Sequence, residues 1–237
     1  MKQKLLISLL ILSLLLNAVF IFRKVYYYFH YKSKPVLTEK TSSDLYKEVY
    51  KHCPYENQEI IFLGNSITAA FKIEEFLPDY KIKNRGISGN TTIDIINRIE
   101  DITRAKPCKL FIMIGINDIV DNIPVNVVLN NYSIILEKIK NQSPETKVFV
   151  QSILPVTKHA SNFFFGNENT LNPLIDEVNN SLSQLAKEKG LIYIDLNELF
   201  ILNEELNQAY SWDGIHINAK GYERWLEHIK PYIVINK

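Results

Sequence analysis

An aspartate and a histidine near the C-terminus form the pair in this sequence that is best suited to acid–base chemistry. Asp213 precedes His216 by three positions, within the segment Ser-Trp-Asp-Gly-Ile-His-Ile-Asn at residues 211–218. A carboxylate at this spacing can bond Nδ1 of the imidazole, which leaves Nε2 free to act as a base. Ser66 is the candidate nucleophile for that base, because it follows an apolar run that is typical of a buried strand. These residue types predict nucleophilic attack by a serine.

Two further turns could donate hydrogen bonds to a developing negative charge. The first reads Arg-Gly-Ile-Ser-Gly-Asn-Thr-Thr at residues 85–92 and contains Gly89, whose N–H would lie near the positive end of a helix. The second reads Gly-Ile-Asn-Asp at residues 115–118 and contains Asn117, whose side-chain NH₂ could donate to an alkoxide. Structural explanations stay open at this point, namely a helix cap at Ser66, a tight connection at Gly89 and an Asn-Asp turn at Asn117.

Other chemistries find less support in the sequence. No lysine follows Gly89, as a phosphate-binding P-loop would require. A metal site would recruit Asp118, Asp213 and His216, but no second histidine stands at a ligand spacing. We therefore expect no cofactor and no metal.

The elements that must position these residues alternate along the chain. Apolar runs predict strands and one-sided apolar patterns predict helices. Near-continuously apolar strands between amphipathic helices predict an α/β fold with a parallel sheet covered on both faces. Ligands bind such sheets outside the carboxyl ends of the strands. The strands are expected at residues 59–63, 80–84, 108–114, 147–152 and 191–195, and the helices at residues 44–52, 92–103, 124–141, 171–189 and 219–233.

Composition excludes some classes of partner. Lys plus Arg is 27 and Asp plus Glu is 26, so the net charge of +1 offers no reason to expect nucleic acid. Cys53 and Cys108 are too few for a zinc site or a disulfide scaffold. Two free thiols are expected, or a single disulfide if the domain lies outside the cytoplasm.

The N-terminus has the pattern of a membrane anchor. Residues 5–22 carry no charge over 18 positions, a length of about 27 Å as a helix, which is close to the thickness of a bilayer core. We expect an uncleaved anchor at residues 1–24, a linker at residues 25–43 and one domain at residues 44–237. A cleaved signal peptide is the alternative, although it usually has a shorter apolar region and a small-x-small cleavage site. Basic residues flank both sides, so charge leaves the orientation open.

Four segments in order resemble the blocks of SGNH hydrolases, also called GDSL-type esterases. They are Gly64-Asn65-Ser66, the turn around Gly89, Gly115-Ile116-Asn117-Asp118 and Asp213-Gly214-Ile215-His216. The residues of the last three blocks are most similar to those of the branch of platelet-activating-factor acetylhydrolase, which includes bacterial enzymes that remove acetyl groups from sugars. Asn65 stands where the namesake motif has aspartate, a position that supports the turn in this family.

The resemblance implies a three-layer, flavodoxin-like domain with a mainly parallel five-stranded sheet. It also implies a serine esterase with Ser66 as nucleophile, His216 as base and Asp213 as the residue that orients the base. The oxyanion hole would consist of the N–H groups of Ser66 and Gly89 and the side chain of Asn117.

We therefore expect a serine esterase that hydrolyses short O-acyl esters, with acetyl the favoured group, of carbohydrate or cell-envelope glycan. A lysophospholipase or thioesterase, a non-catalytic glycan-binding domain and an acyltransferase stay open as alternatives. The expected partners are a small acylated substrate and the membrane, through the N-terminal helix. The resemblance to this family favours a domain outside the cytoplasm. The sequence does not indicate the oligomeric state.

Overall fold

The computed structural model describes residues 21, 41–56, 58–160 and 171–233. The chain divides into two units, Met1–Thr41 and Ser42–Lys237, and the fold below is that of the second. Apart from residue 21, the predicted anchor lies outside the described residues, as does the predicted linker up to residue 40. Within the described ranges, no helix combines the length and the apolar character needed to cross a bilayer.

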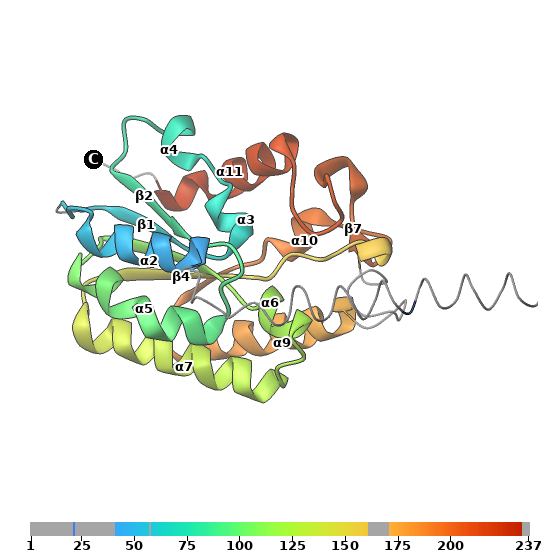
Figure 1. Ribbon diagram of the computed structural model, residues 1–237, viewed down its shortest axis with the longest axis horizontal. Helices are drawn as coiled ribbons and strands as arrows, with labels where there is room; N and C mark the ends of the chain where they lie inside the picture. The colour runs from blue at the N-terminus through green and yellow to red at the C-terminus, as the bar shows by residue number, and fades with distance from the viewer. Residues whose placement is uncertain (1–20, 22–40, 57, 161–170, 234–237) are drawn as a thin grey trace, which may run out of the picture. The chain divides into compact units, whose positions relative to one another are not determined.

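Five parallel strands form the sheet in the order β2-β1-β3-β4-β5 (Figure 1). The strands run over β1 Ile60–Gly64, β2 Ile82–Gly86, β3 Lys109–Met113, β4 Lys147–Gln151 and β5 Ile192–Ile194. The predicted α/β class and five-stranded sheet are confirmed, and every pair in the sheet is parallel. A parallel sheet is covered by helices on both faces, so both sides of each strand are buried. This is why its strands appear in the sequence as nearly continuous apolar runs.

The longer helices begin and end within two residues of the predicted positions. Several short elements were not predicted, because one turn of helix is too short to show a period in the sequence. The helices run over α2 Ser42–His52, α3 Ser66–Ala69, α4 Ile73–Phe76, α5 Thr92–Arg104, α6 Ile116–Val120, α7 Val125–Gln142, α9 Leu171–Glu188, α10 Asn197–Phe200 and α11 Ala219–Ile233. A 3₁₀ turn covers Gln208–Tyr210, and a short antiparallel pair consists of β6 Ile201–Leu202 and β7 Glu205–Leu206.

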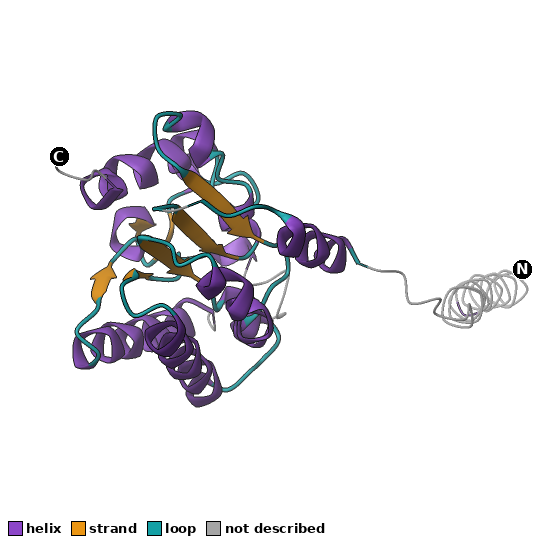
Figure 2. Cartoon of the chain, turned by 90° about the vertical axis from the view of Figure 1, so that its left-hand side faces the viewer, coloured by secondary structure: helices purple, strands orange, loops and turns teal. Residues whose placement is uncertain are grey.

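Two hydrophobic cores lie on opposite faces of the sheet. One joins alternate strand residues to α5, α7 and α9, and the other joins the remaining strand residues to α3, α4, α10 and α11 (Figures 1 and 2). In the second core, Phe62, Phe111 and Phe149 stack across β1, β3 and β4 with ring centroids 4.6 and 4.4 Å apart. The period of two along each strand therefore divides its side chains between two layers of helices, which gives the three-layer architecture.

The two cysteines are not paired in this structure. Cys53 and Cys108 are both free thiols of intermediate exposure. Of the two alternatives that the sequence left open, the structure has the two free thiols.

The ends of the central strands lie at one level. Gly64 at the end of β1 is opposite Gly86 of β2 and Met113 of β3. Gly86 also packs against the first turn of α3, where a Cβ at this position would lie 2.2 Å from the backbone nitrogen of Ala69. Only glycine allows this close approach of β2 to the helix that begins at Ser66.

We predict that Gly86→Ala destabilises the domain more than a glycine substitution without a clash. The added methyl must displace the backbone of α3, so the free energy of unfolding should fall by about 3 kcal/mol. Gly190→Ala is the control, because Gly190 has φ +66° but open space around it, and it should cost only about 1 kcal/mol. Urea unfolding midpoints measure both values, and equal losses would contradict the packing argument.

Candidate active site

Ser66 is the first residue of α3, directly after β1. The preceding residue, Asn65, is buried and accepts a hydrogen bond from the N–H of Ile67 at 3.0 Å. Asn65 therefore caps this helix, and the alternative explanation of Ser66 as the cap is wrong. The hydroxyl of Ser66 is available for another partner because Asn65 already caps the helix.

That partner is His216, which lies 150 residues further along the chain. Ser66 Oγ is 2.8 Å from His216 Nε2, and His216 Nδ1 is 2.6 Å from Asp213 Oδ2. The carboxylate requires a proton on Nδ1, so Nε2 carries the lone pair that can accept from the serine hydroxyl. The structure thus brings together the three residues that the sequence singled out from opposite ends of the domain.

The loop that carries the aspartate and histidine is braced on several sides. Ser211 pairs with Ile217 in an antiparallel bridge, and its hydroxyl donates to the carbonyl of His216 at 2.9 Å. Gly214 has φ +92° and accepts from the N–H of Thr157 at 2.8 Å. A Cβ on Gly214 would lie 2.3 Å from Thr157 Oγ1, so the loop needs glycine here for both its conformation and its packing.

The Asp213 carboxylate is held in its ionised form by its neighbours. Oδ1 accepts from the N–H of Ile215 at 3.0 Å and from the N–H of His216 at 2.7 Å, while Oδ2 faces the imidazole. Partial burial alone would raise the pKa of Asp213, but these donors and the imidazole outweigh it and hold the pKa below its ordinary value. The group is therefore a carboxylate throughout the neutral range.

Asn117 and the turn around Gly89 meet after β3 and β2. Asn117 Nδ2 donates to the carbonyl of Asn90 at 2.8 Å, next to Gly89 with φ +77°. In the part of the chain that the structure describes, the N–H groups of Ser66 and Gly89 donate to no acceptor. Because β1 lies between β2 and β3, these residues gather where the strand order reverses, the usual ligand position in such a sheet.

The sequence analysis missed a buried arginine that links these turns. Arg98 of α5 is only 5% exposed, and it donates through Nη2 to the carbonyl of Gly64 at 3.1 Å and through Nε to Asn90 Oδ1 at 2.9 Å. Burial lowers the pKa of Arg98 to about 10, so it stays charged at neutral pH. Its signal in the sequence is a cation on the apolar face of a helix, between Ile95 and Ile102.

Asp118 anchors the helix that follows the Gly89 turn. Its buried carboxylate accepts from the N–H of Thr92 at 3.0 Å, and Asn131 Nδ2 donates to Thr92 Oγ1 at 2.8 Å. Burial raises the pKa of Asp118. At the same turn, Thr91 and Asp94 form the capping box of α5. Asp118 thus fastens α5 to α6 through Thr92.

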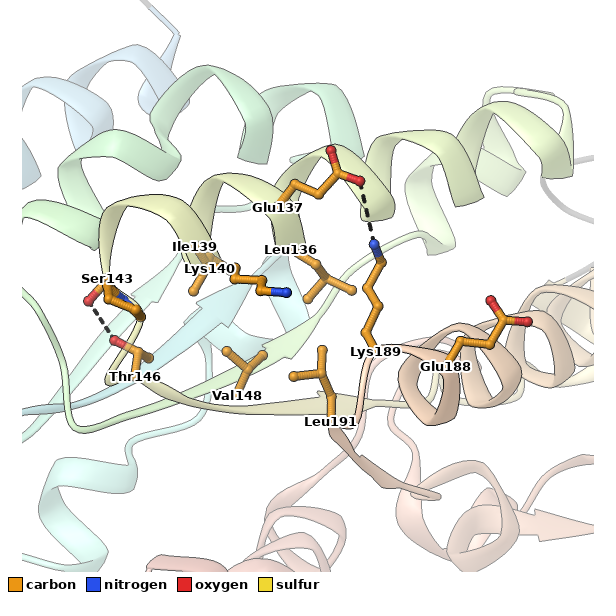
Figure 3. Close-up of a pocket in the computed structure, with 11 residues that line it drawn as sticks. Leu136, Glu137, Ile139, Lys140, Ser143, Thr146, Val148, Glu188, Lys189 and Leu191 are labelled. Carbon is orange, nitrogen blue, oxygen red and sulfur yellow. Dashed lines mark hydrogen bonds and ion pairs between the residues drawn. The ribbon is translucent and has the colours of Figure 1, made fainter.

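A pocket at the other end of the sheet is unrelated to these residues. It has a volume of about 460 Å³ and lies between the last turns of α7 and α9 and the start of β4 (Figure 3). Its ion pair joins Lys189 to Glu137 at 3.5 Å, and Ser143 and Thr146 bond one another at 2.7 Å. No histidine stands among its lining residues to activate a hydroxyl, so it lacks the chemistry found beside Ser66.

The sequence matches the GDSL-like lipase/acylhydrolase family over residues 62–224. It is also similar to an acetylxylan esterase from Geobacillus stearothermophilus, with 30% identity over 154 residues. That alignment covers 60% of this chain and 67% of the esterase.

Solved structures with the same fold include a protein from Streptococcus pneumoniae named for platelet activating factor. It is 26% identical with a TM-score of 0.72, over 81% of this chain and 92% of that one. A GDSL-like lipase from Bacteroides thetaiotaomicron is 22% identical with a TM-score of 0.72, over 82% of this chain and 98% of its own. An acetyl xylan esterase is 20% identical with a TM-score of 0.64, over 74% and 100% of the two chains. At these last two identities, the likeness concerns the fold alone.

The family match takes in more than half of the chain and reaches from β1, which leads into Ser66, to α11, which follows His216. Both halves of the hydrogen-bonded site therefore lie within it, and the chain belongs to the GDSL-like lipase/acylhydrolase family as a hydrolase that acts on ester bonds.

Proposed function

We propose that this protein is a serine esterase that removes short acyl groups, with acetyl the favoured group, from hydroxyls of carbohydrate or cell-envelope glycan. The observation that carries the proposal is the continuous chain from Ser66 Oγ to His216 Nε2 at 2.8 Å and from His216 Nδ1 to Asp213 Oδ2 at 2.6 Å. The acetylxylan esterase among the similar proteins supports a sugar acetate as substrate.

In the proposed reaction, Ser66 Oγ attacks the acyl carbonyl while His216 Nε2 takes its proton. Asp213 keeps the imidazole in the required tautomer and stabilises the imidazolium that forms. The tetrahedral intermediate then breaks its bond to the sugar oxygen, which takes the proton from Nε2 and leaves as a hydroxyl, and an acyl-enzyme remains. Water attacks this ester in the same way, with His216 again as base, and releases the carboxylic acid.

The proposed oxyanion hole consists of the N–H groups of Ser66 and Gly89 and the side chain of Asn117. The Asn117 amide has two hydrogens, and the carbonyl of Asn90 accepts one of them at 2.8 Å. The second hydrogen is left for the oxyanion. The contact with Asn90 thus orients the Asn117 amide before the substrate arrives. Such prior orientation is the condition under which a hydrogen bond to the oxyanion lowers the barrier.

We further propose that the domain is anchored to the membrane by residues 1–24 and works outside the cytoplasm, on envelope glycan. The uncharged stretch of 18 residues supports this proposal.

Replacement of the nucleophile should abolish hydrolysis without loss of the fold. We expect Ser66→Ala, in the chain that lacks residues 1–34, to lower kcat for p-nitrophenyl acetate by at least about 10³-fold, because no acyl-enzyme can form. Asn117→Ala should retain Ser66 and lower kcat by about 10²-fold, with a smaller change in KM.

Steady-state kinetics with a series of acyl lengths test both the chemistry and the substrate. Circular dichroism is the control for folding, and a fluorophosphonate label should mark the parent chain but not Ser66→Ala. Full activity of Ser66→Ala would overturn the assignment of the nucleophile. A rate maximum at eight or more carbons would replace the acetylesterase by a lysophospholipase or thioesterase.

The lowered pKa of Asp213 predicts a particular dependence of stability on pH. The ionised carboxylate stabilises the folded state above its ordinary pKa of about 3.9, and this contribution disappears as pH falls through the lower folded-state value. Asp213→Asn removes the contribution, so the difference in Tm from the parent should be largest near pH 7 and shrink below about pH 4. Its activity should fall by about 10³- to 10⁴-fold.

Thermal unfolding between pH 3 and pH 7 measures this difference. Asp79→Asn is the matched control, since it removes the same charge from an exposed position. A Tm difference for Asp213→Asn that is constant across the range would show that the carboxylate does not stabilise the fold through its charge.

The anchor predicts tight membrane association of the full chain. We expect the full chain to stay in the membrane fraction after alkaline carbonate extraction and the chain without residues 1–34 to be released, because only the former carries the apolar segment. Protease added to intact spheroplasts should digest the domain. A mature N-terminus located after residue 22 would instead identify a cleaved signal peptide.

A further inference from the structure

Ser66 lies in the wall of a pocket of about 530 Å³ that is lined by more than the four blocks named in the sequence analysis. Three segments near the edge of the sheet line this pocket. They are α3 with the residues after it, Glu74 of α4, and the end of β2 with the turn that follows it. A fourth segment is α2, which contributes Tyr46 and Tyr50. This helix lies outside the region that matches the family, which begins at residue 62.

Helix α2 is attached to the domain by polar contacts at the active-site edge. None of its side chains is buried, so it adds little to either hydrophobic core. Lys47 pairs with Asp94 at 3.0 Å, and Asn90 Nδ2 donates to Ser43 Oγ at 3.2 Å. Both partners, Asp94 and Asn90, belong to the turn and helix that follow β2, where Gly89 lies. The helix is therefore placed over the pocket and not over the core.

A buried cation orients the aromatic side chain of Tyr50. Arg85 is 5% exposed, and its guanidinium carbon lies 4.5 Å from the centre of the Tyr50 ring and 5.5 Å from that of Tyr55. Its Nη1 donates to the carbonyl of Asn84 at 3.1 Å, whereas its Nε and Nη2 atoms are buried and have no acceptor among the residues that the structure describes. The two ring faces are then the main electrostatic partners of this charge. Tyr50 is held against it, beside the pocket.

Tyr46 offers an open aromatic surface next to this fixed ring. Its side chain is 50% exposed, and its ring centroid lies 6.0 Å from that of Tyr50 at an angle of 38°. Polar groups stand nearby in the same pocket, including Lys72, Glu74 and Ser88. The pocket thus combines aromatic rings with several hydrogen-bonding groups.

This combination matches the chemistry of a sugar ring. One face of a pyranose consists of C–H groups and stacks on an aromatic ring, while its hydroxyl edge needs hydrogen-bonding partners. A long acyl chain would instead need a continuous apolar wall, which Lys72, Glu74 and Arg85 interrupt. We infer that α2 supplies the binding surface for the sugar that carries the ester, with Tyr46 and Tyr50 as residues that determine specificity. The inference rests on the proposed esterase function.

The test compares a sugar ester with a small ester in the full chain. The substrates are a peracetylated methyl glucopyranoside and ethyl acetate, followed by proton release. We expect Tyr46→Ala to lower kcat/KM for the sugar ester at least tenfold more than for ethyl acetate, chiefly through KM. Tyr46→Phe should behave like the parent, because stacking needs the ring and not the hydroxyl.

Leu45→Ala is the matched control on the same helix. Leu45 is 55% exposed and does not line the pocket, so this variant should leave both substrates unaffected. Equal losses for the two esters with Tyr46→Ala, or no loss for either, would overturn the inference. A loss confined to esters of eight or more carbons would assign the rings to an acyl chain and would overturn it as well.

A binding measurement separates this inference from the proposed function. In a Ser66→Ala background, which cannot turn over the ester, calorimetry with the peracetylated sugar should give a Kd at least tenfold higher when Tyr46→Ala is added. Failure of the parent to hydrolyse ethyl acetate would count against the esterase alone. Unchanged sugar affinity in the double variant would count against the α2 surface alone.

Discussion

The buried guanidinium of Arg98 is the contact on which the active-site edge depends. It bonds the carbonyl of Gly64 at 3.1 Å, two residues before Ser66, and the side chain of Asn90 at 2.9 Å, one residue after Gly89. The backbone of Asn90 in turn accepts from Asn117 at 2.8 Å. Without the cation, the buried side-chain oxygen of Asn90 would lose its donor, at a cost of about 1–3 kcal/mol. The carbonyl of Gly64 would keep only the N–H of Ile87, at 3.1 Å. One charge thus connects the ends of three strands.

The other half of the site is held to the first by the final helix. Tyr222 of α11 donates through its hydroxyl to the carbonyl of Ile67 at 2.8 Å, which joins α11 directly to α3. On the same helix, Trp225 is fully buried and bonds Gln151 of β4 at 2.8 Å. These contacts set the histidine loop at a definite height above the sheet. Ser66 and His216 therefore meet within hydrogen-bond distance without any movement of the chain, as efficient catalysis requires.

Helix α2 shows how a common scaffold acquires its own binding surface. The sheet and its two layers of helices position Ser66, and the same arrangement occurs in relatives that cover most of the chain. The helix before the first strand adds two tyrosines to the pocket without entering the core. Because α2 contributes little buried apolar area, its sequence can vary with the substrate while the stability of the domain is kept.

Local patterns in the sequence determined the five strands and the longer helices, and they predicted the chemistry of Ser66, Asp213 and His216. These depend on periodicity and residue type, which a single chain displays directly. Tertiary structure alone decided the strand order, the burial of Arg98, the cap at Asn65 and the place of α2 beside the pocket. Each of these depends on partners far apart in sequence or on a single hydrogen bond, and neither leaves a repeating pattern. The contact between Ser66 and His216 spans 150 residues, so only the packing of α11 against α3 and the sheet could bring it about.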